Sequence, residues 1–84
     1  MSLIKLKKAL SEQEVVFGTE RTIKALKTKK VSEVFISKNC PEDLKERIIK
    51  YSKINGANVN ELKEINKELG AVCKKPFAVN VCYY

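Results

Sequence analysis

The segment Gly18–Lys24 combines the features that proteins use to bind phosphate. A short apolar run ends at Gly18, and a stretch with helical spacing follows directly. A strand that turns straight into a helix leaves unpaired backbone N–H groups at the helix start, and these donors and the positive end of the helix dipole attract anions. Arg21 lies in the first turn, and Lys24 and Lys27 follow about one and two turns later. The alternative is that Gly18 is only a turn residue and the lysines are only solvated, but their grouping favours an anionic partner.

The charge of the chain is unevenly distributed. Seventeen Lys and Arg stand against ten Asp and Glu, which gives a net charge of +7. Residues 1–30 hold eight cations and three anions, so this part carries +5 of the total. A basic surface also serves solubility, yet a concentration of charge in one part of the chain is typical of nucleic-acid binding.

The residue types argue against an enzyme or a metalloprotein. The 84 residues contain no histidine, and the three cysteines Cys40, Cys73 and Cys82 show no Cys-x-x-Cys spacing. Gly18 has no second glycine or Gly-Lys-Ser/Thr after it, so a nucleotide P-loop is excluded. No paired carboxylates suggest acid–base chemistry. We therefore expect no catalytic residue, no metal and no cofactor, and reduced cysteines that serve packing.

No apolar run is long enough to span a membrane. Lys5, Lys7 and Lys8 interrupt the apolar positions near the N-terminus, which is unlike a signal peptide. We expect a cytoplasmic protein without a membrane partner, and a single domain over residues 1–84.

The spacing of apolar residues predicts helices that alternate strictly with strands. Such alternation predicts an α/β domain with helices on both faces of one sheet. The expected helices cover residues 3–10, 20–29, 41–55 and 66–73, and the expected strands cover 15–17, 31–37, 58–62 and 77–84. The last strand would carry Phe77, Val79, Val81 and Tyr83 on one face.

Several polar residues stand where helix caps are expected. Thr19 is a plausible N-cap of the second helix, and Asn39 or Cys40 would cap the third. Gly56 is expected to end that third helix. Asn66 is either the N-cap of the last helix or a polar contact, and spacing alone does not separate these alternatives.

Three segments in register resemble a known family. They are Gly18–Lys27, Lys38–Glu46 and Glu68–Phe77. Their order and spacing resemble the L-thirty-e branch of the L-seven-Ae and L-thirty-e superfamily of kink-turn RNA-binding ribosomal proteins, over about Val15–Val81. The resemblance implies a three-layer α/β/α sandwich with a small four-stranded mixed sheet. It also implies RNA rather than DNA as the partner, in the large ribosomal subunit.

The resemblance places the RNA site on loops at one end of the sheet. The element that enters a widened groove beside sheared G·A pairs would be the turn into the second helix. An apolar side chain of the loop before the last helix would pack on extruded bases. Together with Lys27, which the charge pattern adds, the implied RNA-binding residues are Gly18, Thr19, Glu20, Arg21, Lys24, Lys38, Asn39, Ile65 and Asn66.

The chain departs from its relatives at one informative place. The L-seven-Ae branch has Asn-Glu where this chain has Glu20-Arg21, so direct reading of the G·A pairs by that couple is not carried over. Glu20 would accept from a guanine edge or cap the helix, and Arg21 would contact phosphate. The alternative function is a protein-interaction module on the same fold, which acidic loops would have favoured.

Overall fold

Helices and strands alternate along residues 2–84, the part of the chain that the computed structural model describes. The predicted order of elements is confirmed. The elements are α1 (Ser2–Glu12), β1 (Val16–Phe17), α2 (Thr19–Thr28), β2 (Glu33–Ile36), α3 (Glu42–Asn55), β3 (Asn58–Glu61), α4 (Asn66–Val72) and β4 (Val81–Tyr83).

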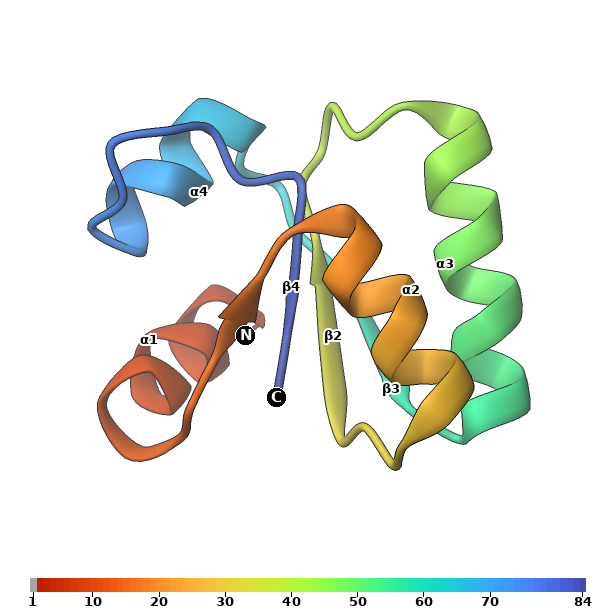
Figure 1. Cartoon of the computed structure of the whole chain (residues 1–84). Coiled ribbons are helices and arrows are strands. Elements are labelled where there is room, and N and C mark those ends of the chain that lie inside the picture. Colours follow the sequence, from red (N-terminus) through yellow and green to blue (C-terminus); the bar gives the residue numbers. More distant parts are fainter. Residues whose placement is uncertain (1) are drawn as a thin grey trace.

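The four strands form one mixed sheet in the order β1-β4-β2-β3 (Figure 1). The last strand, β4, lies between β1 and β2 and is antiparallel to both, whereas β2 and β3 are parallel. Because β1 and β2 both oppose β4, strands β1, β2 and β3 all run in the same direction. Their carboxyl ends therefore reach one edge of the sheet, the upper edge in Figure 1, where β4 begins.

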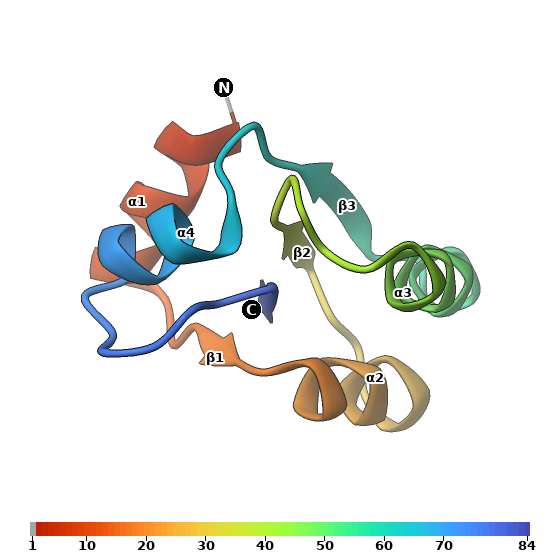
Figure 2. The same ribbon diagram turned by 90° about the horizontal axis from the view of Figure 1, so that it is seen from above.

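Helices cover both faces of the sheet, so the predicted three-layer α/β/α sandwich is confirmed. Helices α1 and α4 lie on one face, and α2 and α3 lie on the other (Figures 1 and 2). Strand residues alternate between the two resulting cores, as the period of two in a strand requires. Val34 and Ile36 of β2 pack with α2 and α3, whereas Phe35 packs with α1 and α4.

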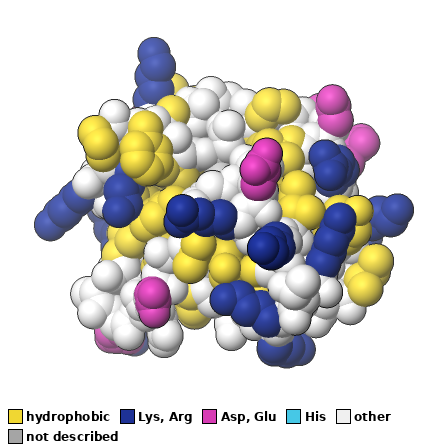
Figure 3. Space-filling model, in the orientation of Figure 1, with side chains coloured by type: hydrophobic (Ala, Val, Ile, Leu, Met, Phe, Trp, Pro, Cys, Tyr) yellow, Lys and Arg dark blue, Asp and Glu magenta, His cyan; other side chains and the backbone are white. Residues whose placement is uncertain are grey.

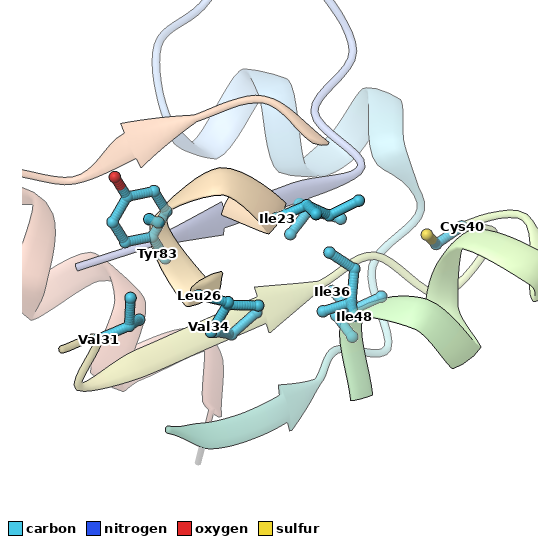
Figure 4. Packing of buried hydrophobic residues seen from close by; sticks show 10 residues of the cluster. Ile23, Leu26, Val31, Val34, Ile36, Cys40, Ile48 and Tyr83 are labelled. Atoms are coloured by element: carbon cyan, nitrogen blue, oxygen red, sulfur yellow. The ribbon is translucent and has the colours of Figure 1, made fainter. Parts of the chain in front are cut away.

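The core under α2 and α3 fixes the orientation of α2. Ile23 and Leu26 of α2 and Ile48 of α3 pack against the β2 residues Val34 and Ile36 (Figure 4). One face of α2 is buried against this core, because Thr22, Ile23, Ala25 and Leu26 are all buried. The remaining face of the helix, with its lysines, is left toward solvent.

Several predicted boundaries are wrong by a residue or more; β2, for example, begins at Glu33 and not at residue 31. Helix α1 continues through Ser11 and Glu12, past its expected end at residue 10, and the Ser11 hydroxyl donates to the Lys8 carbonyl at 2.9 Å. The last strand is limited to Val81–Tyr83, because the Val79 N–H donates to the Asn66 carbonyl at 3.0 Å instead of to a strand.

The expected common face of residues 77–83 is also wrong. Val79 belongs to the core beside α1 and α4, whereas Val81 and Tyr83 belong to the core beside α2 and α3. Phe77 remains 55% exposed. The alternation of apolar residues therefore predicts a strand from residue 77, although the observed strand begins only at Val81.

Helix α3 begins and ends at special residues. Its N-cap is Pro41, not Asn39 or Cys40, and its C-cap is Gly56 in the left-handed conformation, as predicted. Asn55 joins α3 to α2, because its side chain donates to the Leu26 carbonyl at 2.9 Å and accepts from the Val31 N–H at 3.1 Å. In residues 2–84 no helix has both the length and the apolar character needed to cross a membrane.

Helix α4 ends in a strained turn at Lys74. The φ of this residue is 57°, a left-handed conformation that glycine usually supplies at this position. The turn is closed by hydrogen bonds from the Lys74 N–H to the Ala71 carbonyl at 3.0 Å and from the Lys75 N–H to the Gly70 carbonyl at 2.9 Å. A lysine at this position stores strain from its Cβ atom.

Lys74→Gly should raise the free energy of unfolding by about 0.5–1 kcal/mol, because glycine adopts this conformation without a Cβ clash. Urea denaturation measures the change. The matched control is Lys74→Ala, which removes the same side chain but keeps the Cβ and should leave stability nearly unchanged. Equal stabilities of the Gly and Ala variants would contradict the strain at Lys74.

Candidate nucleic-acid interface

Backbone hydrogen bonds join three turns at the edge of the sheet where β4 begins. The Gly18 N–H donates to the Val81 carbonyl at 3.1 Å, and the Ser37 N–H donates to the Asn80 carbonyl at 2.9 Å. The Lys38 N–H donates to the Glu64 carbonyl at 2.8 Å. We call this surface the loop edge and define it as residues 18–21, 37–41, 62–66 and 78–80. Gly18 and Val81, which are 63 positions apart in the chain, thus meet at this surface.

Three asparagine side chains form a hydrogen-bonded network across the loop edge. Asn39 Oδ1 accepts from the Asn66 backbone N–H at 2.7 Å, and Asn39 Nδ2 donates to Asn66 Oδ1 at 3.1 Å. Asn66 Nδ2 in turn donates to Asn80 Oδ1 at 3.1 Å. Of the two alternatives for Asn66, the polar contact is confirmed, since the N-cap of α4 is Ile65.

Sequence reasoning singled out Asn39 and Asn66 but missed Asn80. No helix or motif pattern marks Asn80, and its role depends on the arrival of the β4 strand beside β2, which periodicity does not reveal. The one available signal was a polar residue between two apolar ones just before the final strand.

The start of α2 offers backbone donors. Its N-cap is Gly18, with φ 119° and ψ 145°, so the prediction that Thr19 is the N-cap is wrong by one residue. Only glycine adopts this φ readily, and Thr19 becomes the first helical residue. The Gly18 carbonyl accepts from the Thr22 N–H at 3.1 Å and from the Thr22 hydroxyl at 2.7 Å. No side chain caps the helix, so the N–H groups of Thr19, Glu20 and Arg21 remain available to an anion.

The predicted cations of α2 lie on its exposed face. Arg21, Lys24 and Lys27 are all exposed. The ion pairs among residues 2–84 are Lys5–Glu33 and Lys45–Glu61, each at 2.6 Å, and neither involves these three side chains. Lys27 Nζ lies 4.8 Å from the centroid of the Tyr51 ring of α3. Lys and Arg side chains are prominent over α2 and α3 in Figure 3.

A groove between α2 and α3 extends this basic surface. It has a volume of about 530 Å³, and its lining includes Lys24, Lys27 and Arg47, with Glu20 near the start of α2. Sequence reasoning missed Arg47. Its position one turn after Asp43, between the half-buried Leu44 and the buried Ile48, was the signal that could have placed it next to α2.

The other predicted residues lie on the loop edge itself. Lys38 is exposed beside Lys63 around a hollow of about 350 Å³. Lys45 borders the same hollow, but it is paired with Glu61, and that hydrogen-bonded carboxylate raises the pKa of the Lys45 ammonium. Ile65 is 37% exposed, so an apolar side chain stands on this surface.

The structure thus gathers the predicted residues into two adjoining groups. Lys38, Asn39, Ile65 and Asn66 lie on the loop edge, and the start of α2 joins them through Gly18 and Val81, the neighbour of Asn80. Lys24 and Lys27 lie further along α2 and line the groove with α3. The arrangement suits an extended anionic ligand better than a small one, because its donors form a strip and not an enclosed cavity.

The cysteines lie apart from any candidate metal site in residues 2–84. No cluster of three or more metal-ligating side chains occurs there. Cys40, Cys73 and Cys82 are free and buried, and burial raises the pKa of the Cys40 thiol. The prediction that Cys73 and Cys82 serve packing is confirmed, since both lie in the core beside α1 and α4.

Comparisons with known proteins agree with this architecture. Residues 2–84 match the model of the ribosomal protein L7Ae/L30e/S12e/Gadd45 family. The chain is 41% identical over 75 residues to the large ribosomal subunit protein eL30 of Sulfurisphaera tokodaii, which covers 89% of this chain and 71% of that protein. It is 42% identical over 71 residues to the eL30 protein of Methanothermobacter thermautotrophicus, with 84% and 72% covered.

A solved structure shares the fold. A protein of unknown function from Bacillus halodurans C superposes with a TM-score of 0.81 at 20% identity, over 96% of this chain and 80% of that chain. The curated relatives are named as ribosomal proteins and not as enzymes, in agreement with the expectation from the residue types.

Asn39→Ala should loosen the loop edge, because the Asn66 N–H loses its acceptor and Asn66 Oδ1 loses a donor. We expect a loss of about 0.5–1.5 kcal/mol of stability, and faster hydrogen exchange at the Asn66 amide. Asn58→Ala is a matched control, because the Asn58 side chain, at the opposite end of β3, bonds only to the half-buried Glu33 carboxylate. An Asn66 amide that stays as protected as in the parent chain would contradict this role of Asn39.

Proposed function

Because the chain belongs to the ribosomal protein L7Ae/L30e/S12e/Gadd45 family, we propose that it is a ribosomal RNA-binding protein of the large subunit, cytoplasmic and ribosome-associated. We further propose that its loop edge holds a kink-turn or a similar bent internal loop. One observation carries the proposal: turns from β1, β2 and β3 meet at one edge, next to a helix start with free amides and unpaired cations.

Phosphate contacts would position the RNA. The N–H groups of Thr19 and Glu20 donate hydrogen bonds to a phosphate at the start of α2, where the helix dipole adds to the attraction. Arg21 and Lys24 neutralise neighbouring phosphates of the RNA backbone. The groove between α2 and α3 lets the backbone continue toward Lys27 and Arg47.

Base contacts would be few and would depend on the shape of the RNA. Asn39 and Asn66 already bond to each other, so they hold the loops in place and keep only part of their hydrogen-bonding capacity for a base. Ile65, exposed beside them, covers an unstacked base at the bend. The free Lys38 lies on the same edge and adds positive charge. Recognition of this kind responds to the bent geometry more than to the sequence of the RNA.

The role of Glu20 follows from its position. It is exposed in the first turn of α2 and lines the groove, where a carboxylate is favoured by the helix dipole. It accepts from a guanine edge or it only stabilises the helix start. Replacement by Gln, which keeps the shape and removes the charge, separates these alternatives by its effect on RNA affinity and on stability.

A kink-turn RNA should bind at least about tenfold more tightly than a straight duplex of equal length and composition, because only the bent loop fits both the loop edge and the start of α2. Electrophoretic mobility shift at fixed salt measures both affinities. Equal affinities would remove the shape-recognition claim, and binding of a protein partner with no RNA would favour the interaction-module alternative.

Lys24→Ala should weaken binding of the kink-turn RNA by about 1 kcal/mol, or about fivefold, because a charge-assisted phosphate contact is lost. The slope of log affinity against log salt should fall in magnitude by about one for this variant. Lys53→Ala is the matched control, since Lys53 is exposed on α3 away from the groove. An equal loss in the two variants would assign the effect to net charge alone.

A further inference from the structure

A second hollow lies on the other side of the molecule from α2 and α3. It forms where α1, β1 and the end of α4 come together, on the left of Figure 1, and has a volume of about 690 Å³. Its lining includes Lys7 and Leu10 of α1, Phe17 of β1 and the segment Val72–Lys75. None of the residues predicted to bind RNA lines it, so the proposed function leaves this hollow unexplained.

The rim of the hollow is cationic. Lys7, Lys74 and Lys75 are exposed around it, and neither ion pair found in residues 2–84 involves them. Glu12, the last residue of α1, and Glu14, between α1 and β1, do not line it. The rim therefore favours a ligand that carries negative charge.

The backbone holds these cations in place. Lys74 occupies a left-handed conformation at the end of α4, and the Lys75 N–H is fixed to the Gly70 carbonyl at 2.9 Å. This turn brings Lys75 Nζ to 4.8 Å from the centroid of the Phe17 ring. The cation–π contact keeps the ammonium over the hollow instead of extended into solvent.

The floor of the hollow is apolar. Leu10, Val15 and Phe17 pack on the core beside α1 and α4, and these three residues and Val72 are half-buried, so part of each remains open to a ligand. Lys75 covers the Phe17 ring, so that ring is blocked as a stacking platform for a nucleic-acid base. Aliphatic side chains can fill such a floor, and carboxylates can meet the lysine rim.

We propose that this hollow is a docking site for a protein partner, and that the bound segment combines Asp or Glu with aliphatic side chains. The lysines of the rim favour the acidic side chains of the partner, and the apolar floor favours its aliphatic side chains. The site is separate from the loop edge, so a single copy of the chain can hold RNA on one side and a protein segment on the other. The proposal does not depend on the nature of the RNA.

Selection from a displayed library of random twelve-residue peptides on the full chain tests this proposal. We expect enriched peptides that carry both acidic and aliphatic residues. Their affinity, measured by fluorescence anisotropy, should fall at least tenfold for the double variant Lys7→Glu, Lys75→Glu. Lys8→Glu is the matched control, because Lys8 is exposed on the same helix but does not line the hollow, and it should change the affinity less than twofold.

Three results would overturn the docking site: no acidic, aliphatic peptides are enriched, the double variant binds them as well as the parent chain does, or Lys8→Glu weakens binding as much. Amide chemical shifts separate this site from the RNA site. The peptide should shift the amides of Lys7, Leu10 and Lys75, and Lys24→Ala should leave its affinity unchanged. A kink-turn RNA that shifts these same amides would assign the hollow to RNA instead.

Discussion

The insertion of the C-terminal strand between β1 and β2 is the constraint on which the rest of the structure depends. Because β4 is antiparallel to both neighbours, the two strands must run in the same direction and must end at the same edge. The hydrogen bonds from Gly18 to Val81 and from Ser37 to Asn80 continue this pairing beyond the strands and into the turns. The strand nearest the C-terminus thus brings together turns that lie much earlier in the sequence.

The loop edge and the adjoining start of α2 differ in physical character. The asparagine network holds the loop edge through side chains that bond to each other, so its shape is set before any ligand arrives and less ordering is needed on binding. The start of α2 carries unpaired donors and exposed cations, which are satisfied only when an anion is present. The loop edge thus offers a rigid surface of amide and apolar groups, and the start of α2 beside it is electropositive. This combination fits a folded RNA, in which the bent backbone and the unstacked bases lie close together.

The sequence predicted much of this arrangement, because strong local signals existed. The apolar stripe of α2, the glycine stop of α3 and the alternation of helix and strand are all properties of short windows, and each is found in the structure. The errors arose where long-range packing overrides the local pattern. The alternate apolar residues 77–83 look like one strand, yet Val79 turns to the other core because its N–H is taken by Asn66.

The same reasoning explains which site residues were missed. Asn80 and Arg47 have ordinary surroundings in the sequence, and they gain their roles only when β4 reaches β2 and when α3 packs beside α2. The N-cap of α2 was misplaced by one residue because a threonine after a glycine is the commoner cap, whereas the φ of 119° at Gly18 decides the matter. The motifs that the chain shares with its relatives supplied what spacing alone did not, namely that Lys38 and Ile65 belong to one surface.

The most direct test of the loop edge as the RNA-binding surface is an amide chemical-shift map of the full chain with a kink-turn RNA. The account predicts that one set of amides, drawn from three distant segments, shifts together while the amides of α1 stay unchanged. That set is Thr19, Glu20, Lys38, Asn39, Ile65 and Asn66. Shifts confined to α1 and the end of α4, with these six amides unmoved, would contradict the account.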